Sequence, residues 1–434
     1  QVDITRATVE RAKGVKTQVF SQLLPQVTVA PQYTRILETP FAAFFPPSAT
    51  ENPFTARNQW RLGGNVGWTP VNLAGYSQVE AASRGIDLAR LQLTQQQAFT
   101  ILTVASAYYN AVLAEQLLGI RRQTLEQAER TYKEIQLGYE VGTQSEFDAL
   151  RARVARDNQV PVVTQARATR DINVTQLKQL LDIPVPQPLV LDSVLEPGAT
   201  APQLPDTLRQ VLGVADTAVE ARTAVRQYEV QVEAARATYD AAGRQWLPTV
   251  SGFMNYAYAG FGTSFWPEGD QFFDDWNVGF ALNWPIFTGG RILGERKAAK
   301  ADLDVAELSY KLTKEQAALD NVSVVARLGE AEDNAVATQA VVEQASRAYE
   351  IAELRFREGL STQTELQDVR LQLEQARANR AQSIRDLEVA RLRLVLLPYL
   401  PLGTADPSIV NAGVSTRQAI GSVSSSITAS GQGR

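Results

Sequence analysis

The sequence repeats one order of segments, and this duplication constrains the fold more than any other feature. The segment LLPQVTVAPQY at 23–33 resembles WLPTVSGFMNY at 246–256. Four spaced residues also recur, each 217 positions later: Ala128, Tyr132, Leu137 and Gly142, as Ala345, Tyr349, Leu354 and Gly359. We therefore predict two structural repeats, 1–184 and 206–398, each made of a helix, a β-hairpin and a long helical hairpin. A Pro-rich linker at 185–205 joins them, and an irregular tail at 399–434 follows.

Long helices are predicted in each repeat. The segments 75–180 and 290–397 are rich in Ala, Leu, Gln, Glu and Arg, which favour helix. Each arm would run for about 65 residues, or roughly 100 Å, with a kink at Pro161. Apolar residues recur there at seven-residue spacing, which is typical of a coiled-coil seam. They are Leu91, Ala98, Ala105 and Val112, then Val305, Leu312, Leu319 and Ala326, and then Leu366, Leu373, Leu387 and Leu394, where Arg380 interrupts the spacing once.

Two stretches have the alternation of β-strands. WRLGGNVGW at 60–68 and WNVGFALNW at 276–284 each place apolar residues at every second position. A strand that spans a bilayer takes about 9–11 residues and is flanked by interfacial aromatic residues. Strands of soluble sandwiches alternate too, but tryptophan at both ends of both stretches favours the membrane: Trp60, Trp68, Trp276 and Trp284. Their partner strands are expected near 24–37 and 247–260, with exterior loops at 39–54 and 261–275.

Four strands cannot close a barrel, and an open sheet edge is not viable in lipid. A membrane chain of this kind must therefore form oligomers. Two, three or four copies would give 8, 12 or 16 strands, and the sequence alone does not choose among them. The helical arms would extend the same tube beyond the membrane. The alternative is a non-membrane protein, either a coiled-coil scaffold or a periplasmic adaptor-like protein with a small β-domain.

Composition argues against catalysis and nucleic-acid binding. The chain has no histidine, no cysteine and one methionine, which removes most zinc sites, thiol nucleophiles and Ser-His-Asp triads. Its net charge is −5, without the basic cluster that nucleic acid requires. We predict no enzymatic activity, no cofactor, no metal site and no nucleic-acid partner. Because the chain begins at Gln1, an exported form would have lost its signal peptide.

In the order and spacing of these parts, the chain resembles the TolC-type outer-membrane efflux protein family, the outer membrane factors. The resemblance covers nearly the whole chain, including the WPIFTGGR junction at 284–291 and both Tyr-x9-Gly hairpins. It implies a homotrimer with a 12-stranded β-barrel, four strands per chain, in the lipid of a Gram-negative outer membrane. A long α-helical barrel would continue this barrel through the periplasm.

The resemblance also implies a function and partners. The chain would be the passive export duct of a tripartite efflux or type I secretion system. It would meet a periplasmic adaptor (membrane fusion) protein and an inner-membrane pump of the RND or ABC type. The sequence does not identify the cargo.

Two hairpin tips are implied as the docking site. In the family, these turns carry Val-Gly-Thr or Val-Gly-Leu, and the adaptor contacts them. The matching residues here are Val141, Gly142 and Thr143 in the first tip, and Glu358, Gly359 and Leu360 in the second. Glu358 departs from the family pattern.

The family also places acids six and nine residues after the second tip glycine. Glu365 and Asp368 match them, which implies a ring of carboxylates that narrows the pore and favours cations. A solvated exterior helix face is the alternative.

A further acid, Asp148, matches one that holds the family's tip closed by bonding to a Tyr and an Arg. The partner positions here are Phe356 and Ser361, which cannot form that ionic contact. The closed state must therefore be held differently, and Arg151 and Arg355 are the candidates.

Overall fold

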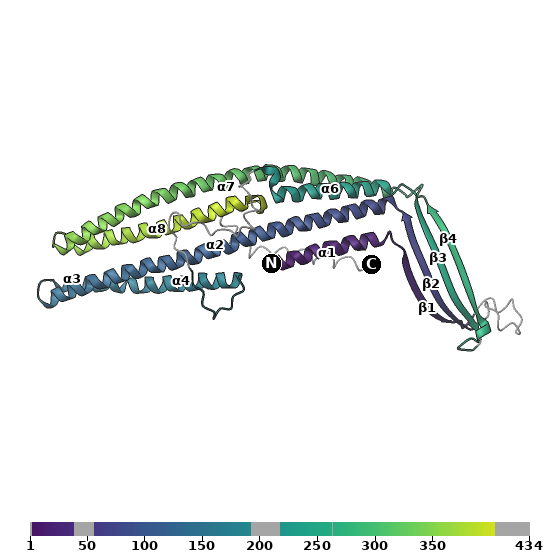
Figure 1. The fold of residues 1–434 in the computed structure, drawn as a ribbon, viewed down its shortest axis with the longest axis horizontal. Coiled ribbons are helices and arrows are strands. Elements are labelled where there is room, and N and C mark those ends of the chain that lie inside the picture. The colour runs from purple at the N-terminus through teal and green to yellow at the C-terminus, as the bar shows by residue number, and fades with distance from the viewer. Residues whose placement is uncertain (1, 39–55, 192–217, 263, 404–434) are drawn as a thin grey trace. The chain divides into compact units, whose positions relative to one another are not determined.

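The computed structural model describes residues 2–38, 56–191, 218–262 and 264–403 (Figure 1). The predicted loop at 39–54, the linker beyond residue 191 and the tail beyond residue 403 lie outside the described residues. The chain divides into two compact units, and each unit draws on both halves of the sequence. The helical unit comprises Gln1–Val2, Thr94–Arg226 and Thr313–Arg434, and the strand-bearing unit comprises Asp3–Leu93 and Gln227–Leu312.

Helices form the predicted arms. The two longest contain 68 and 67 residues, close to the predicted length. In each half, one long helix is followed by a turn and a returning helix. The helices are α1 Val2–Ser21, α2 Leu73–Glu140, α3 Glu146–Asp157, α4 Gln159–Leu180, α6 Thr223–Arg244, α7 Arg291–Arg357 and α8 Gln363–Leu396. Short 3₁₀ turns lie at η2 Val219–Ala221, η3 Gly269–Gln271 and η4 Leu397–Tyr399.

The first returning arm is broken between α3 and α4, where the sequence predicts a kink. Asn158 separates the two helices, three residues before Pro161. Pro161 has no N–H to donate to the carbonyl of Asp157, and its ring crowds that carbonyl. The equivalent arm of the second half, α8, has no proline and runs for 34 residues without a break.

The four strands form one antiparallel sheet in the order β1-β2-β3-β4. They are β1 Gln26–Arg35, β2 Asn58–Val71, β3 Thr249–Gly262 and β4 Phe272–Asn283. β2 and β4 are longer than the nine residues predicted, with 14 and 12 residues. Among the described residues, β1 pairs only with β2 and β4 only with β3, so each outer strand has an edge that is open there.

Strand register gives the sheet two different faces. On one, called the apolar face, Trp60 is paired with Tyr33 and Tyr256 with Trp276. It carries Val27, Val29 and Tyr33 of β1, Trp60, Leu62, Val66 and Trp68 of β2, Met254, Tyr256 and Tyr258 of β3, and Trp276, Val278, Phe280 and Leu282 of β4. The other, called the polar face, carries residues such as Thr28, Asn65, Asn255 and Asn277. Val278 and Phe280 on the apolar face are 77% and 79% exposed.

The helical unit is held by small apolar clusters and not by one large core. Ala98 and Leu102 of α2 pack against Leu396 of α8 and Leu400 beyond it. Farther along, Tyr109 and Val112 of α2 contact Ile384 of α8. Arg380, which interrupts the seven-residue spacing, is buried and donates a hydrogen bond to the carbonyl of Ala335. The two halves of the sequence are therefore joined along α2 and α8.

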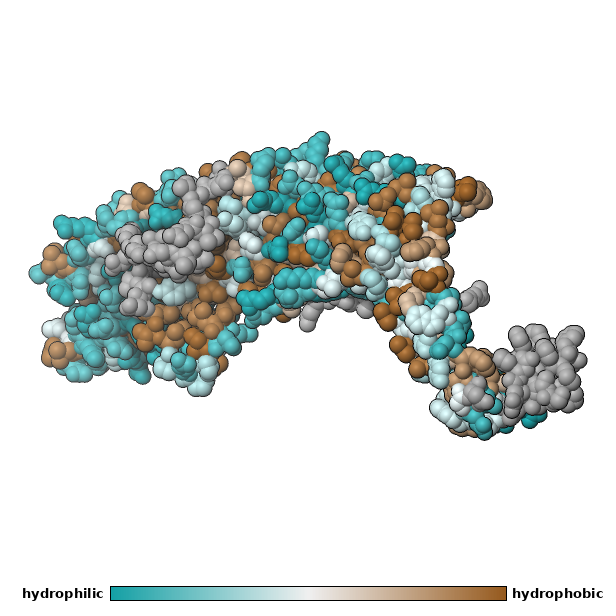
Figure 2. Space-filling view, turned by 45° about the vertical axis from the view of Figure 1, so that its right-hand side comes forward, coloured by the Kyte–Doolittle hydropathy of each residue, from teal (hydrophilic) through white to brown (hydrophobic). Residues whose placement is uncertain are grey.

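A large part of the predicted seam on α7 is uncovered in the single chain. Leu102 is fully buried, whereas Leu319, 217 residues later, is 69% exposed. Other apolar residues of α7 at the same helical spacing are also exposed: Val305, Leu308 and Leu312 in the strand-bearing unit, and Val322 and Val336 in the helical unit. Figure 2 shows apolar side chains reaching the surface among hydrophilic ones. We call these six residues, Leu319 included, the α7 stripe.

Candidate functional site

The first hairpin tip is a helix C-terminus closed by a glycine. Gly142 has φ +80°, in the left-handed region that favours glycine. The N–H of Thr143 donates to the carbonyl of Gly138 at 2.8 Å, and the N–H of Gly142 donates to that of Tyr139 at 3.0 Å. This pair of bonds is a Schellman motif, which ends α2 and satisfies its last carbonyls.

The second tip repeats this geometry. Gly359 has φ +71°. The N–H of Leu360 donates to the carbonyl of Arg355 at 2.8 Å, and the N–H of Gly359 donates to that of Phe356 at 3.1 Å. Both turns lie at the same end of the helices of this unit (Figure 1). At both tips the predicted docking residues are solvent-exposed: Val141, Gly142 and Thr143, with Glu358, Gly359 and Leu360.

An acid follows each glycine by six residues because each returning helix begins with the same cap. Ser145 accepts a hydrogen bond from the N–H of Asp148 at 3.1 Å. Thr362 accepts one from the N–H of Glu365 at 3.3 Å. An acid in the first turn is also favoured by the partial positive charge of the helix N-terminus. Asp148 and Glu365 thus have a structural role that does not depend on any pore.

The two acids of the predicted pore ring lie on one exposed face of α8, as their spacing predicts. Glu365 lies 3.8 Å from the guanidinium of Arg355, and both side chains are about half exposed. Arg355 also donates to the carbonyl of Leu360 at 3.4 Å. Within the described ranges, Asp368 forms no ion pair. Of the two acids, Asp368 therefore has the less compensated charge.

Of the residues considered for tip closure, Phe356 makes the contact between the two hairpins. Its ring packs against Ile135 of α2 and against Ala149 and Ala152 of α3, together with Tyr132. These residues are here called the tip cluster. The contact is apolar, because a phenylalanine can contribute only apolar surface.

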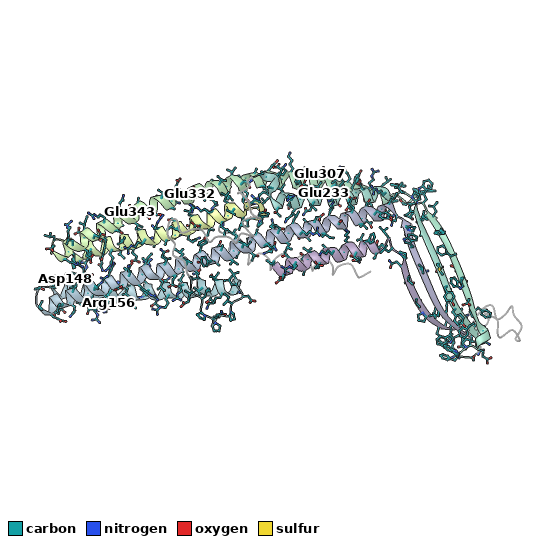
Figure 3. All side chains as sticks on the ribbon, viewed as in Figure 1. Asp148, Arg156, Glu233, Glu307, Glu332 and Glu343 are labelled. Atoms are coloured by element: carbon teal, nitrogen blue, oxygen red, sulfur yellow. The ribbon has the colours of Figure 1, made fainter. Side chains whose placement is uncertain are left out.

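Two other residues considered for tip closure, Asp148 and Arg151, lie in the first turns of α3. Asp148, labelled in Figure 3 at the start of α3, accepts a hydrogen bond from the Ser145 hydroxyl at 2.5 Å. Arg151 is exposed and, in the part of the chain that the structure describes, forms no ion pair. Farther along α3, the guanidinium of Arg156 lies 4.6 Å from the ring centre of Tyr132, a cation–π contact that supports the tip cluster.

The four predicted interface tryptophans fall into two pairs. Trp60 donates its indole N–H to the carbonyl of Phe265 at 2.7 Å, and Trp68 donates its own to Leu23 at 2.9 Å. Both therefore anchor neighbouring segments of their own chain. Trp276 and Trp284 are 65% and 61% exposed and extend from the apolar face and from the residue just after β4. This second pair is the better placed to contact a surrounding interface.

A buried ion pair in the helical unit was not anticipated from the sequence. Arg222 has no exposed surface and donates to Asp320 at 2.7 Å and to Asn321 at 2.5 Å. Asp320 also accepts a hydrogen bond from the N–H of Gly403 at 3.2 Å. The pair therefore connects the start of the second half, the middle of α7 and the segment after α8.

The grouping of acidic side chains and the hydropathy of the helices bear on the kind of site present. Among the described residues, no three or more of the side chains His, Cys, Asp and Glu gather where they could hold a metal ion. In the same residues, none of the helices combines the length and the hydropathy needed to cross a membrane.

Comparison with known proteins identifies the fold. The outer membrane protein VceC of Vibrio cholerae superposes with a TM-score of 0.73, covering 92% of each chain at 19% identity. The fold of this chain is therefore similar to that of this outer membrane protein.

The sequence comparisons lead to the family. Residues 214–397 match the model of the outer membrane efflux protein family. Nodulation protein T of Rhizobium leguminosarum bv. viciae is 24% identical over 324 residues, 73% of this chain and 63% of the relative. The pyoverdine export outer membrane protein OpmQ of Pseudomonas putida is 24% identical over 339 residues, 75% and 66% of the two chains. The matches span slightly less than two thirds of each relative. The chain is therefore similar to the outer membrane efflux proteins, and the family model covers its second half.

Proposed function

We propose that this chain is one protomer of a trimeric outer-membrane channel, a passive duct for export. The single observation that carries the proposal is the sheet, with its exposed apolar face and two open edges. Its 12- and 14-residue strands are long enough for a bilayer. At ~3.3 Å per residue they extend about 40 Å, and a tilt near 45° leaves roughly 30 Å across the membrane.

Closure of the sheet requires further copies of the chain. In lipid, the unpaired N–H and C=O groups of β1 and β4 need partners, and joining β4 of one copy to β1 of the next supplies them. Three copies give the twelve strands that the family resemblance implies. The polar face then lines the interior, and the apolar face contacts lipid.

The α7 stripe supports the same assembly. Within one chain, α2 of the first half packs against α8 of the second. By the repeat, α7 should pack in the same way against the returning helix of a first half, and in a ring that helix belongs to the next copy. Exposed apolar residues on α4, Val160 and Ile172, are available for this contact. The assembled helices would then form a barrel in which first and second halves of the chains alternate.

The tips then form the periplasmic end of the channel. We assign the two glycine turns to docking of a periplasmic adaptor, which links the channel to an inner-membrane pump. Glu365 and Asp368 would form the acidic ring, one set from each copy. The tip cluster around Phe356 would hold the hairpins of each copy together when the channel is closed.

The decisive experiment determines the mass and conductance of the purified chain. In detergent, light scattering should give three copies per particle, and in planar bilayers the particles should conduct ions. A chain that is soluble and monomeric without detergent would refute the channel and favour a coiled-coil scaffold.

A further inference from the structure

The polar face of the sheet carries a row of amide side chains. Asn65, Asn255 and Asn277 lie opposite one another on β2, β3 and β4. Asn65 donates to Asn255 at 2.5 Å, and Asn255 donates to Asn277 at 2.6 Å. A primary amide has two donors and an acceptor with two lone pairs. These hydrogen bonds therefore hold the three side chains in place. The remaining amide donors and acceptors can bond to a further partner.

An aromatic ring lies beside this row. Phe253 is the next residue of β3 on the polar face and is paired with Gly67 on one side and Gly279 on the other. Its ring covers Gly279, where an added Cβ would lie 2.7 Å from the ring. Phe253 is nevertheless 39% exposed. The glycine thus lets the ring lie against the sheet with surface still open.

Gly67 is paired with Phe253 from the neighbouring strand and places no side chain beside the ring. The side-chain oxygen of Asn65 lies 3.8 Å from the position of a Cβ at Gly67. A hydrogen-bond acceptor and an aromatic ring therefore lie on either side of one glycine position on the polar face.

On the side of the row toward the helices, the polar face carries no charge. From the asparagine row to the helix ends of the strands, every residue on the polar face is neutral. The charged residues of this face, Arg61 and Asp275, lie beyond the row, toward the loop end. An ion held beside Gly67 would lose hydration without gaining a counter-charge from these neutral residues.

We propose that Phe253, Gly67 and Asn65 form a binding site for neutral, planar aromatic solutes that carry an N–H or O–H donor. The ring of the solute stacks on Phe253, and its donor bonds to the Asn65 oxygen. This site rests on the proposed channel function, because the polar face lines a lumen only when copies close the barrel. It gives the duct a weak preference among the compounds that pass through it.

The test uses two neutral amides that differ only in the ring. Benzamide is planar and aromatic, whereas cyclohexanecarboxamide has the same donor on a saturated ring. In single-channel recordings, benzamide should reduce the current reversibly at concentrations about fivefold lower than cyclohexanecarboxamide, a ratio within the range for one aromatic contact. Phe253→Leu should abolish this difference, and Phe253→Tyr should keep it.

Matched variants separate the site from assembly. Phe273→Leu changes a phenylalanine on the same face near the loops and should leave the benzamide effect intact. Asn65→Ala should weaken the effect of both amides, because it removes the acceptor. Equal block by the two amides, or unchanged selectivity in Phe253→Leu, would overturn the site while the channel stands. A chain that forms no conducting oligomer would instead overturn the proposed function, and the site with it.

Discussion

Arg222 and Asp320 form a wholly internal ion pair, 2.7 Å apart, although they are separated by 98 residues in the sequence. Around them, Asn321 accepts a hydrogen bond from Arg222, and the backbone N–H of Gly403 donates one to Asp320. The pair fixes the start of α6 and the segment after α8 to the same point on α7. Removing one partner leaves a buried charge uncompensated, which is much more costly than losing an exposed pair.

Arg222→Met is therefore expected to lower the stability of the helical unit by about 3 kcal/mol. The double variant Arg222→Met with Asp320→Leu should recover part of this loss, because no lone charge remains. Thermal unfolding followed by helical circular dichroism measures both. Arg6→Met serves as the control, since Arg6 pairs with Asp3 on the surface and its loss should not move the midpoint. Equal midpoints for Arg222→Met and Arg6→Met would contradict the assignment.

The sequence allowed prediction of the features that depend on neighbouring residues. Glycine at the turns, the alternation of β2 and β4, and the break near Pro161 all follow from local chemistry. The Arg222–Asp320 pair could not be predicted, because it joins distant segments whose approach is set by helix packing. The same holds for the tip cluster: the sequence indicated that an ionic contact was missing at Phe356, but not which apolar residues replace it. The asparagine row required the strand register, which alternation alone does not fix.

The tip cluster leads to a prediction about how readily the channel opens at its hairpin tips. Phe356→Ala removes the ring that contacts Ile135 and Ala152, so the two hairpins should separate more readily. In planar bilayers the variant should show a higher conductance than the wild type. Leu354→Ala is the matched control on the same helix, because Leu354 is 62% exposed and should not contribute. A conductance unchanged in Phe356→Ala would show that the cluster does not restrict the pore.

Salt distinguishes this apolar contact from an ionic one. The chain has no cysteine, so a disulfide between cysteines introduced at Ile135 and Phe356 reports directly on the distance between the hairpins. An ionic contact would loosen as salt rises from about 0.1 to 1 M, whereas an apolar one is not screened. This pair replaces two members of the cluster, so a second pair outside it, cysteines at Arg130 and Tyr349, which line the same groove between α2 and α7, should be tested beside it. A strong decrease in cross-linking with salt would contradict the apolar contact.

The tip glycines allow the turn and the docking role to be tested separately. An added side chain at Gly142 meets no atom within 4 Å, so its cost comes from the left-handed backbone alone. Asparagine tolerates this conformation better than alanine, and Gly142→Asn should assemble normally while Gly142→Ala loses about 1 kcal/mol. If an adaptor contacts the tip, Gly142→Asn should still reduce export. Gly119→Asn, at an open position inside α2, is the control. Normal export by assembled Gly142→Asn would argue against docking at this glycine.

The contact of Arg355 with Glu365 leads to a prediction about cation binding at the predicted acidic ring. Because the guanidinium lies 3.8 Å from the carboxylate, it offsets part of the negative charge that a cation would meet. Arg355→Ala should therefore strengthen block of the channel by divalent cations, by a few-fold at most since both side chains are half exposed. Glu365→Ala with Asp368→Ala should weaken it. Glu353→Ala removes an acid that pairs with Arg357 on α7, and it should leave the block unchanged. Recordings in which Arg355→Ala and the double variant shift block in the same direction would exclude these acids as the site of cation binding.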